Sequence, residues 1–413
     1  MENPKTRVVV VNYNGGEQTL ECLQALVADD PNRELDIVLV DNASNDHLVQ
    51  RMPTELPSVR VIPSKTNLGF GGGNNLALAD LGGIDFVALI NSDARVRPGW
   101  LAPLKNALLA NPALGAACPR IRLAGEFITV DISAHRPLTV AGAWVDGQDV
   151  SARVQYGPTF GAPEPPTPEV SRARRLKNAG QIWVPVNPTT STISLRVLDG
   201  GPAIFSADRA AVSSERHRSL RTVEVPVGPP RMRLLNNTGN YWTRDGFSAD
   251  RGWLEPDQPS RYAVSEPVEA WCGAAVLLRA DCWLATGNFD EKLFLYYEDA
   301  DLSERAKNLG WSFIYVPESL VDHDHATSTG EDSLLALRLT ERNRLTVIRR
   351  YQRGGVKAVM KSLIATLGYA RRDLFTRPLR WRLPRSKIVS ARLRAVSGSI
   401  SAKLSPKSKD QNN

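Results

Sequence analysis

Three acidic residues, Glu298, Asp299 and Asp301, stand within four positions, directly after the mainly aromatic run Phe294–Tyr297. Carboxylates this crowded can take up a proton or help to bind a cation. The spacing of apolar residues after Asp299 predicts a helix that begins there. Free N–H groups at the helix start and the helix dipole would keep the Asp299 carboxylate ionised at the edge of a pocket. The alternative is that the three acids only cap the helix.

Upstream of this stretch, apolar segments alternate with helical patterns. The expected strands cover residues 7–11, 35–40, 58–63 and 86–90, and the expected helices cover 17–28, 76–81 and 98–110. Each strand is followed by a polar stretch that contains amide or acidic side chains: residues 12–16, 41–46, 67–75 and 91–93. The alternation predicts an α/β fold with a parallel, doubly wound sheet, whose ligand lies outside the carboxyl ends of the strands.

A run of glycines follows the third expected strand, at positions 69 and 71–73. Its spacing is not that of a dinucleotide fingerprint, and it does not follow the first strand, so a nicotinamide-dependent oxidoreductase is disfavoured. We expect instead a loop whose backbone approaches a ligand closely, with Asn74 or Asn75 offering amide hydrogen bonds.

The remaining chain divides into three parts. Residues 122–235 lack helical patterns and contain alternating segments at 192–197 and 222–225, which predict a β-rich insertion with either a structural or a carbohydrate-binding role. Residues 236–337 return to the first fold, which begins with residues 1–121. There, Trp311–Val316 is an expected strand, and His323 and His325 follow it at strand spacing as possible metal ligands or as ordinary surface residues.

Charge is distributed unevenly along the chain. Residues 338–413 carry 20 Lys and Arg against 3 Asp and Glu, whereas residues 1–337 carry 31 against 41. The basic tail contains Val356, Met360, Leu363 and Leu367 at helical spacing. It is consistent with a helix that lies on an anionic membrane, or with one packed on the body and followed by a disordered end from about Ser386. No recognised nucleic-acid-binding module accompanies the charge.

The composition is that of a globular protein. The four cysteines are far apart and in no metal-binding spacing, which favours reduced thiols. No signal peptide and no apolar run of eighteen residues is recognised, so we expect a cytoplasmic protein.

Six motifs in order resemble those of the family 2 glycosyltransferases, and within that family the rhamnosyltransferase-type bacterial enzymes. They are Val11–Asn14, Val40–Ser44, Asn67–Gly71, Asn91–Asp93, Phe289–Glu291 together with Tyr297–Leu302, and His323. The resemblance covers residues 7–120 and 236–350. It implies the GT-A fold, in which a Rossmann-like nucleotide-binding half joins an acceptor-binding half, and the transfer of a sugar with inversion at the anomeric carbon.

The resemblance also implies roles for particular residues. Asp299 would be the catalytic base. The donor-binding residues would be Asn12, Tyr13, Asp41, Asn42, Ser44, Asn67, Gly69, Asn75, Asn91 and Asp93. The acceptor-binding residues would be Trp271, Gly273, Glu298 and Asp301, although Trp271 could instead be a core aromatic.

A divalent metal, Mg²⁺ or Mn²⁺, is implied as the cofactor, with Asp93 and His323 as its ligands and His325 as the substitute. Asn91 departs from the family pattern, which has an acid at that position, and this leaves a site with one carboxylate. The expected partners are a nucleotide-sugar donor, first dTDP-rhamnose and then a UDP-hexose, and a cell-envelope glycan or polyprenyl-linked acceptor. The alternative function is a catalytically silent sugar-binding protein with the same fold.

Overall fold

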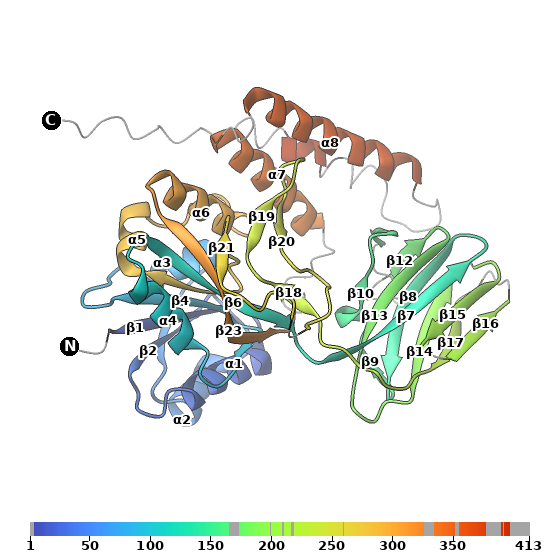
Figure 1. The fold of residues 1–413 in the computed structure, drawn as a ribbon, viewed down its shortest axis with the longest axis horizontal. Coiled ribbons are helices and arrows are strands. Elements are labelled where there is room, and N and C mark those ends of the chain that lie inside the picture. The colour runs from blue at the N-terminus through green and yellow to red at the C-terminus, as the bar shows by residue number, and fades with distance from the viewer. Residues whose placement is uncertain are drawn as a thin grey trace.

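The computed structural model describes residues 4–164, 173–198, 200–208, 210–215, 219–258, 260–325, 334–351, 355–376, 390 and 392–396. Within them, a ten-stranded mixed sheet forms the centre of the α/β body (Figure 1). Its strands are β1 (Thr6–Asn12), β2 (Leu35–Asp41), β3 (Arg60–Pro63), β4 (Phe86–Asn91), β5 (Ala94–Val96), β6 (Leu114–Leu123), β18 (Leu235–Asn237), β21 (Glu266–Val268), β22 (Ala275–Arg279) and β23 (Ser312–His323).

The sheet is mixed: β22 is inserted in the antiparallel direction between β4 and β6, and β6 pairs with β23 in the parallel direction. Strands β3, β2, β1 and β4 are parallel, and β22 joins β4 in the antiparallel direction before β6, β23 and β21 follow. The parallel α/β arrangement predicted from the alternating segments is therefore confirmed. Buried aliphatic side chains cover both faces of the sheet, because successive strand residues point to opposite sides.

Helices pack on this sheet and beside it: α1 (Gly16–Ala28), α2 (Leu48–Glu55), α3 (Gly69–Ala77), α4 (Leu101–Ala110), α5 (Ala280–Thr286), α6 (Glu298–Asn308), α7 (Leu334–Tyr351) and α8 (Gly355–Thr376). The expected glycine loop is wrong, because the run forms α3 itself, and the helix expected over residues 76–81 ends at Ala77. A Cβ atom at Gly71 would stand 2.8 Å from the Phe289 Cβ, and one at Gly73 would stand 2.7 Å from Val11. Glycine is needed there because the helix packs so closely on its neighbours.

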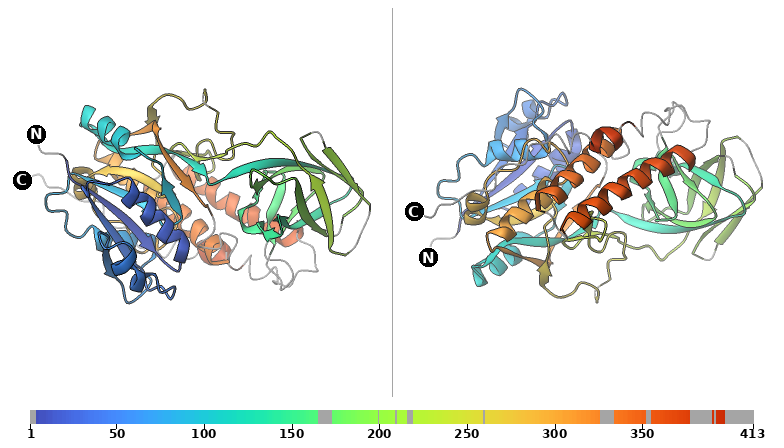
Figure 2. Two further views of the ribbon diagram at one scale, coloured as in Figure 1. Left: turned by 90° about the horizontal axis from the view of Figure 1, so that it is seen from below. Right: turned by 90° about the horizontal axis from the view of Figure 1, so that it is seen from above.

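Residues 126–226 form two antiparallel sheets that share one apolar core and lie to one side of the body (Figures 1 and 2). The first contains β7 (Glu126–Ala134), β10 (Gln155–Tyr156), β13 (Ala179–Val186), β15 (Ala203–Ala207) and β16 (Ala210–Ser214). The second contains β8 (Leu138–Val145), β9 (Gln148–Asp149), β11 (Phe160–Glu164), β12 (Ala173–Leu176), β14 (Thr192–Leu198) and β17 (Arg221–Pro226). The two ends of this segment meet where β18 pairs with β6.

A short hairpin of β19 (Asn240–Trp242) and β20 (Ser248–Asp250) follows β18. Helices α7 and α8 pack against each other, and α7 also contacts α6. None of the described helices is long and apolar enough to cross a membrane. The disordered end expected from Ser386 falls mostly outside the described residues.

Candidate active site

The loop before α6 turns sharply three times. Phe294, Tyr296 and Tyr297 all have left-handed backbone conformations, with φ of 65°, 70° and 70°. Each such residue costs about 1–2 kcal/mol, so the surrounding structure must hold the loop in place. The result is that Glu298 and Asp299, the first residues of α6, line a cavity of about 350 Å³.

Asp299 accepts two backbone hydrogen bonds at the edge of this cavity. Its Oδ2 accepts from the Gly273 N–H at 3.0 Å, and its Oδ1 accepts from the Ala300 N–H at 2.7 Å. Burial raises the pKa of Asp299 above its ordinary value, while the two N–H groups oppose that rise. The group is thus an oriented carboxylate that is more basic than one in water. Gly273 lines the same cavity and acts on Asp299 through its N–H group.

Glu298 is buried next to Asp299, with only 7 % of its surface exposed. Its Oε2 has no hydrogen-bond partner among the described residues. Burial, followed by the charge of Asp299, raises the pKa of Glu298 to about 8. Because the charge of Asp299 contributes to this rise, Glu298 is the acid of the pair that keeps its proton to the higher pH.

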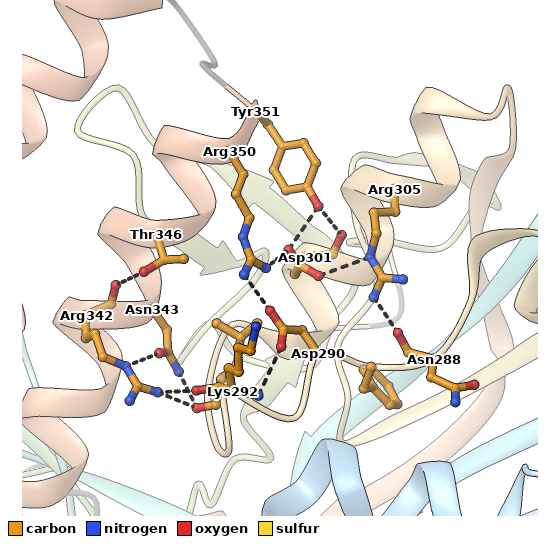
Figure 3. A network of polar contacts seen from close by, with 12 residues as sticks. Asn288, Asp290, Lys292, Asp301, Arg305, Arg342, Asn343, Thr346, Arg350 and Tyr351 are labelled. Atoms are coloured by element: carbon orange, nitrogen blue, oxygen red, sulfur yellow. Dashed lines mark hydrogen bonds and ion pairs between the residues drawn. The ribbon is translucent and has the colours of Figure 1, made fainter. Parts of the chain in front are cut away.

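Asp301 does not face the cavity, and its predicted role in acceptor binding is wrong. Its carboxylate is 1 % exposed and accepts from Arg305 at 3.1 Å, from Arg350 at 2.9 Å and from the Tyr351 hydroxyl at 2.9 Å (Figure 3). Arg350 also pairs with Asp290. The helix places Asp301 two residues after Asp299, and a rotation of about 200° directs its side chain toward α7.

Helix α7 also holds the turning loop. The fully buried Asn343 donates from its Nδ2 to the carbonyl oxygens of Leu293, Leu295 and Tyr296 at 2.8, 2.9 and 2.7 Å. Figure 3 shows Asn343 and Arg342 pointing from α7 toward this loop. Sequence reasoning assigned α7 to the basic tail and missed this contact, since nothing in the spacing of Asn343 connects it to a loop fifty residues earlier.

The strand ends on the other side of the site line a second cavity. Of the predicted donor-binding residues, Tyr13, Asn42, Asn67, Gly69, Asn91 and Asp93 line it together. The Tyr13 ring is 46 % exposed, as a stacking surface requires. Asn42 fixes the loop that follows β3, because it donates to the carbonyl oxygen of Gly69 and to the side chain of Asn67 at 3.0 Å each.

Other predicted donor residues do not line this cavity. Asn12 is fully buried and holds the turn after β2 by donating to Ser44 and Asp46. Asn75 links α3 to the Phe289 backbone, donating at 3.0 Å and accepting at 2.9 Å. Contacts within the fold occupy both amides, those of Asn12 with side chains of the turn after β2 and those of Asn75 with the Phe289 backbone, so neither amide lies in the donor cavity.

Asp41 and Ser44 stand at the neighbouring strand end and also line neither cavity. Asp41 accepts from the Ser44 N–H at 3.3 Å, so the pair shapes the turn after β2.

Trp271 is likewise not an acceptor surface. It is 1 % exposed and packs edge-to-face on Phe313 in the core, with ring centroids 4.7 Å apart. The structure therefore supports the alternative that Trp271 is an aromatic residue of the hydrophobic core.

Asp93 and His323 face each other where the two cavities meet. The Asp93 Oδ1 lies 3.0 Å from the His323 Nε2, and the His323 Nδ1 lies 2.6 Å from the Asn236 Oδ1. This network assigns the Nδ1 proton to the bond with Asn236. Burial acts to raise the pKa of Asp93, but the neighbouring His323 outweighs it and lowers the pKa to about 2. Asn91 approaches the same imidazole at 3.4 Å, and His325 also lines the cavity.

These residues fit a divalent cation only as a partial ligand set. The described residues contain no group of three or more His, Cys, Asp or Glu side chains placed to hold a metal. Asp93 and His323 can offer one carboxylate and one imidazole nitrogen, and Asn236 orients that nitrogen from behind. Mg²⁺ commonly binds in this way, with one or two carboxylates and the remaining positions filled by substrate phosphates and water.

The cavity beside Asp299 has a wall that sequence reasoning missed. It consists of residues from β18 and the β19–β20 hairpin: Asn236, Asn240, Phe247, Ser248 and Asp250. In the sequence these residues lie at the start of the stretch 236–350 that resembles the family, but they belong to none of its six motifs, so no signal assigned them to the site. The two cavities share Phe70, Asn91, Asp93 and Leu295, so a group held in one lies next to a group held in the other.

Two stretches of the chain match family profiles. Residues 7–136 match Glycosyl transferase family 2, and residues 257–346 match Glycosyltransferase like family 2. The chain is 26 % identical over 335 residues to the N-acetylglucosaminyl-diphospho-decaprenol L-rhamnosyltransferase of Mycobacterium tuberculosis, in strain CDC 1551 / Oshkosh and in strain ATCC 25618 / H37Rv. The match covers 79 % of this chain and 78 % of the relative.

Solved structures with a similar arrangement include GalNAc-T7 with UDP, GalNAc and Mn²⁺, which is 14 % identical, with a TM-score of 0.49 over 96 % of this chain and 55 % of that one. The mannosyltransferase PcManGT of Pyrobaculum calidifontis with GDP-Man and Mn²⁺ is 13 % identical, with a TM-score of 0.43 over 98 % and 78 % of the two chains. Similarity at this level does not assign a ligand to this chain.

Proposed function

Because this chain belongs to the family 2 glycosyltransferases, we propose that it is an inverting enzyme that moves a sugar from a nucleotide diphosphate to an acceptor hydroxyl. The observation that carries the proposal is the position of Asp299. Its carboxylate lines one cavity, and that cavity shares Asn91 and Asp93 with the cavity lined by Tyr13. We assign the donor to the Tyr13 cavity and the acceptor to the Asp299 cavity.

In the proposed reaction, Asp299 is the general base. The acceptor oxygen forms a bond to the anomeric carbon, its proton passes to the Asp299 carboxylate, and the bond to the nucleoside diphosphate breaks. The N–H groups of Gly273 and Ala300 hold the carboxylate in one orientation, and burial makes it more basic. General-base catalysis of this kind contributes about 10²–10⁴-fold. Glu298 stays protonated beside it and can donate a hydrogen bond to the acceptor.

We also propose a divalent metal, Mg²⁺ or Mn²⁺, at Asp93 and His323. When bound, the ion would neutralise charge on the diphosphate leaving group. Asp93 supplies an ionised carboxylate, and Asn236 keeps the His323 Nε2 directed toward it. Asn91 would offer an amide beside this pair in place of a second carboxylate.

The first candidate for the donor is dTDP-rhamnose, and for the acceptor an N-acetylglucosamine linked to a polyprenyl diphosphate. The sugar and the acceptor follow from the name of the mycobacterial relative, and the dTDP carrier is the expectation from the family resemblance. Such a product belongs to the assembly of a cell-envelope polysaccharide.

A lipid-linked acceptor would require the enzyme to work at a membrane surface, and we propose that α8 binds there. Met360, Ile364 and Leu367 are 51, 62 and 52 % exposed and share one face of this helix. Lys361 and Arg371 are exposed on the same helix. An apolar stripe with basic neighbours is suited to the interface of an anionic membrane. The enzyme would then be a cytoplasmic protein that attaches peripherally to the inner face of the cell membrane.

The decisive experiment is a panel of nucleotide sugars, including dTDP-rhamnose, UDP-glucose and UDP-N-acetylglucosamine, with a prenyl-diphospho-N-acetylglucosamine acceptor. Release of nucleoside diphosphate is measured with Mg²⁺, with Mn²⁺ and with EDTA, for the wild type and for Asp299→Asn. We expect metal-dependent release from one donor and a loss of about 10²-fold or more in Asp299→Asn. Release that survives this substitution would remove Asp299 as the base, and release in EDTA would remove the metal.

A further inference from the structure

The cavity beside Asp299 is lined on one side by a segment that neither family profile covers. The profiles match residues 7–136 and 257–346, whereas β18 and the β19–β20 hairpin span residues 235–250. The base and the donor cavity thus belong to the part shared with the family. The hairpin wall lies outside both matched stretches, and it faces the position that we assign to the acceptor.

A buried amide holds one carboxylate of this wall. Asn237 is fully buried, donates from its Nδ2 to Asp250 and to the Asn240 side chain, and accepts at its Oδ1 from the Gly239 N–H at 2.6 Å. Among the described residues, Asn237 is the hydrogen-bond partner of the Asp250 carboxylate, and it occupies Oδ1. A carboxylate has about four acceptor positions, so Asp250 is fixed in place with capacity left toward the cavity that it lines.

Acidic side chains gather around this cavity. Asp93, Asp250, Glu298 and Asp299 line it, and no Lys or Arg is among its described lining residues. Away from the metal position proposed at Asp93 and His323, a carboxylate on the acceptor sugar would find no Lys or Arg to pair with, whereas sugar hydroxyl groups can donate to the acids. The unpartnered Oε2 of Glu298, on a side chain that is 7 % exposed, is a second sign that a polar ligand completes this cavity.

We propose that Asp250 is the acceptor-recognition residue of this enzyme, that it accepts a hydrogen bond from a hydroxyl of the acceptor sugar, and that the cavity selects a neutral sugar over one with an acidic group on its ring. This inference rests on the proposed transferase function. It also requires that the diphosphate of a prenyl-linked acceptor lies outside the cavity, with only the sugar inside.

The test compares Asp250→Asn with Asp245→Asn, a substitution of an exposed acid in the same hairpin that does not line the cavity. The acceptors are prenyl-diphospho-N-acetylglucosamine and its glucuronic acid analogue, used with the donor that the wild type turns over. For Asp250→Asn we expect the KM for the neutral acceptor to rise about 10–100-fold, more than kcat falls, because a hydrogen bond to a charged group is lost. We also expect the ratio of kcat/KM for the neutral acceptor to kcat/KM for the acidic acceptor to fall by at least about fivefold in Asp250→Asn. In Asp245→Asn, the KM and this ratio should stay at their wild-type values.

Binding of dTDP to the same variants, measured by calorimetry, separates recognition from folding. Affinity within about twofold of wild type, together with the changed KM, supports the assignment. If the wild type is active and Asp250→Asn keeps the wild-type KM and acceptor preference, the inference about Asp250 is overturned while the proposed function stands. A loss of dTDP binding in Asp250→Asn would also overturn the inference, because Asp250 would then be a structural residue. If the wild type turns over no donor with either acceptor, the proposed function itself fails.

Discussion

Asn343 provides a sharp test of whether α7 positions the catalytic loop. The substitution Asn343→Ala removes the donors of three buried hydrogen bonds to Leu293, Leu295 and Tyr296. The loop contains three left-handed aromatic residues, which together cost about 3–6 kcal/mol, at 1–2 kcal/mol each. The amide has two N–H groups, which the three carbonyl oxygens share, so these bonds contribute about 2–3 kcal/mol in total and offset a large part of that cost. Without them, the left-handed conformation is no longer favoured over a relaxed one.

We therefore expect two effects of Asn343→Ala. The free energy of unfolding should fall by about 2–4 kcal/mol, because carbonyl groups lose their donors and water replaces only part of the loss. The value of kcat should fall by about 10²-fold, because a displacement of about 1 Å at Asp299 is sufficient for such a loss. Affinity for dTDP should change much less, since of the loop residues only Phe294 and Leu295 line the donor cavity.

The measurements are urea unfolding, steady-state kinetics and dTDP calorimetry on Asn343→Ala and on Thr346→Ala. Thr346 lies one turn further along α7, and its hydroxyl donates to the Arg342 carbonyl at 2.8 Å, within the helix itself. This control should lose less than about 1 kcal/mol and keep its kcat. An Asn343→Ala enzyme that loses stability but keeps kcat within twofold would show that α7 stabilises the body without positioning Asp299.

Three further predictions concern the loop contact, the acid pair and the surface of α8. Gly69→Ala should weaken dTDP binding by at least about tenfold, because the backbone φ is +74° and the new Cβ would stand 2.1 Å from the Phe294 carbonyl oxygen. The Glu298→Gln variant should become more stable relative to wild type as the pH rises from 4.5 to 8.5. Because the pKa of Glu298 is raised to about 8 in the folded protein, the protonated side chain contributes fully to stability below about pH 4.5, and this contribution is lost as the pH rises through about 8. The expected change in the free energy of unfolding is about 1–3 kcal/mol. Three exposed apolar residues of α8 are to be replaced by serine together: Met360, Ile364 and Leu367. This triple substitution should reduce binding to phosphatidylglycerol vesicles by about tenfold or more.

The first and the third of these predictions have a matched control variant, and the second compares one variant at two pH values. Gly83→Ala has nearly the same φ, +73°, with no atom within 4 Å, so an equal loss of dTDP binding in both variants would refute the role of the Phe294 contact. For Glu298→Gln, chemical unfolding at pH 5 and pH 8.5 is the measurement, and a pH-independent difference would mean that Glu298 is ionised throughout. For α8 the control is Leu109→Ser, an exposed leucine of α4; vesicle binding that is equal in all variants would exclude α8 as the membrane-binding surface.

Local patterns were sufficient for the α/β fold and for the main chemical groups. Alternating apolar segments and polar strand ends predicted β1, β2, β3 and β4, because burial and strand periodicity are properties of short stretches. The same reasoning placed Asp299 at the start of a helix. It failed for the glycine run of α3, since the need for glycine there comes from close packing against Val11 and Phe289 rather than from a loop.

The sequence by itself determined which side chains could do chemistry, and only the tertiary structure decided which of them face the cavities. Asp301 and Asp299 stand two residues apart, yet the turn of α6 sends one toward Arg350 and the other toward the cavity. Asn12 and Asn75 have suitable amides, but contacts within the fold occupy them: the Ser44 side chain for Asn12 and the Phe289 backbone for Asn75. Asn236, Asp250 and Asn343 reach the site from distant segments, and such contacts depend on how separate elements pack. The spacing of residues along the chain does not predict that packing. The cavity wall formed by β18 and the β19–β20 hairpin, and the hydrogen bonds from Asn343 to the loop before α6, could therefore be identified only in the folded chain.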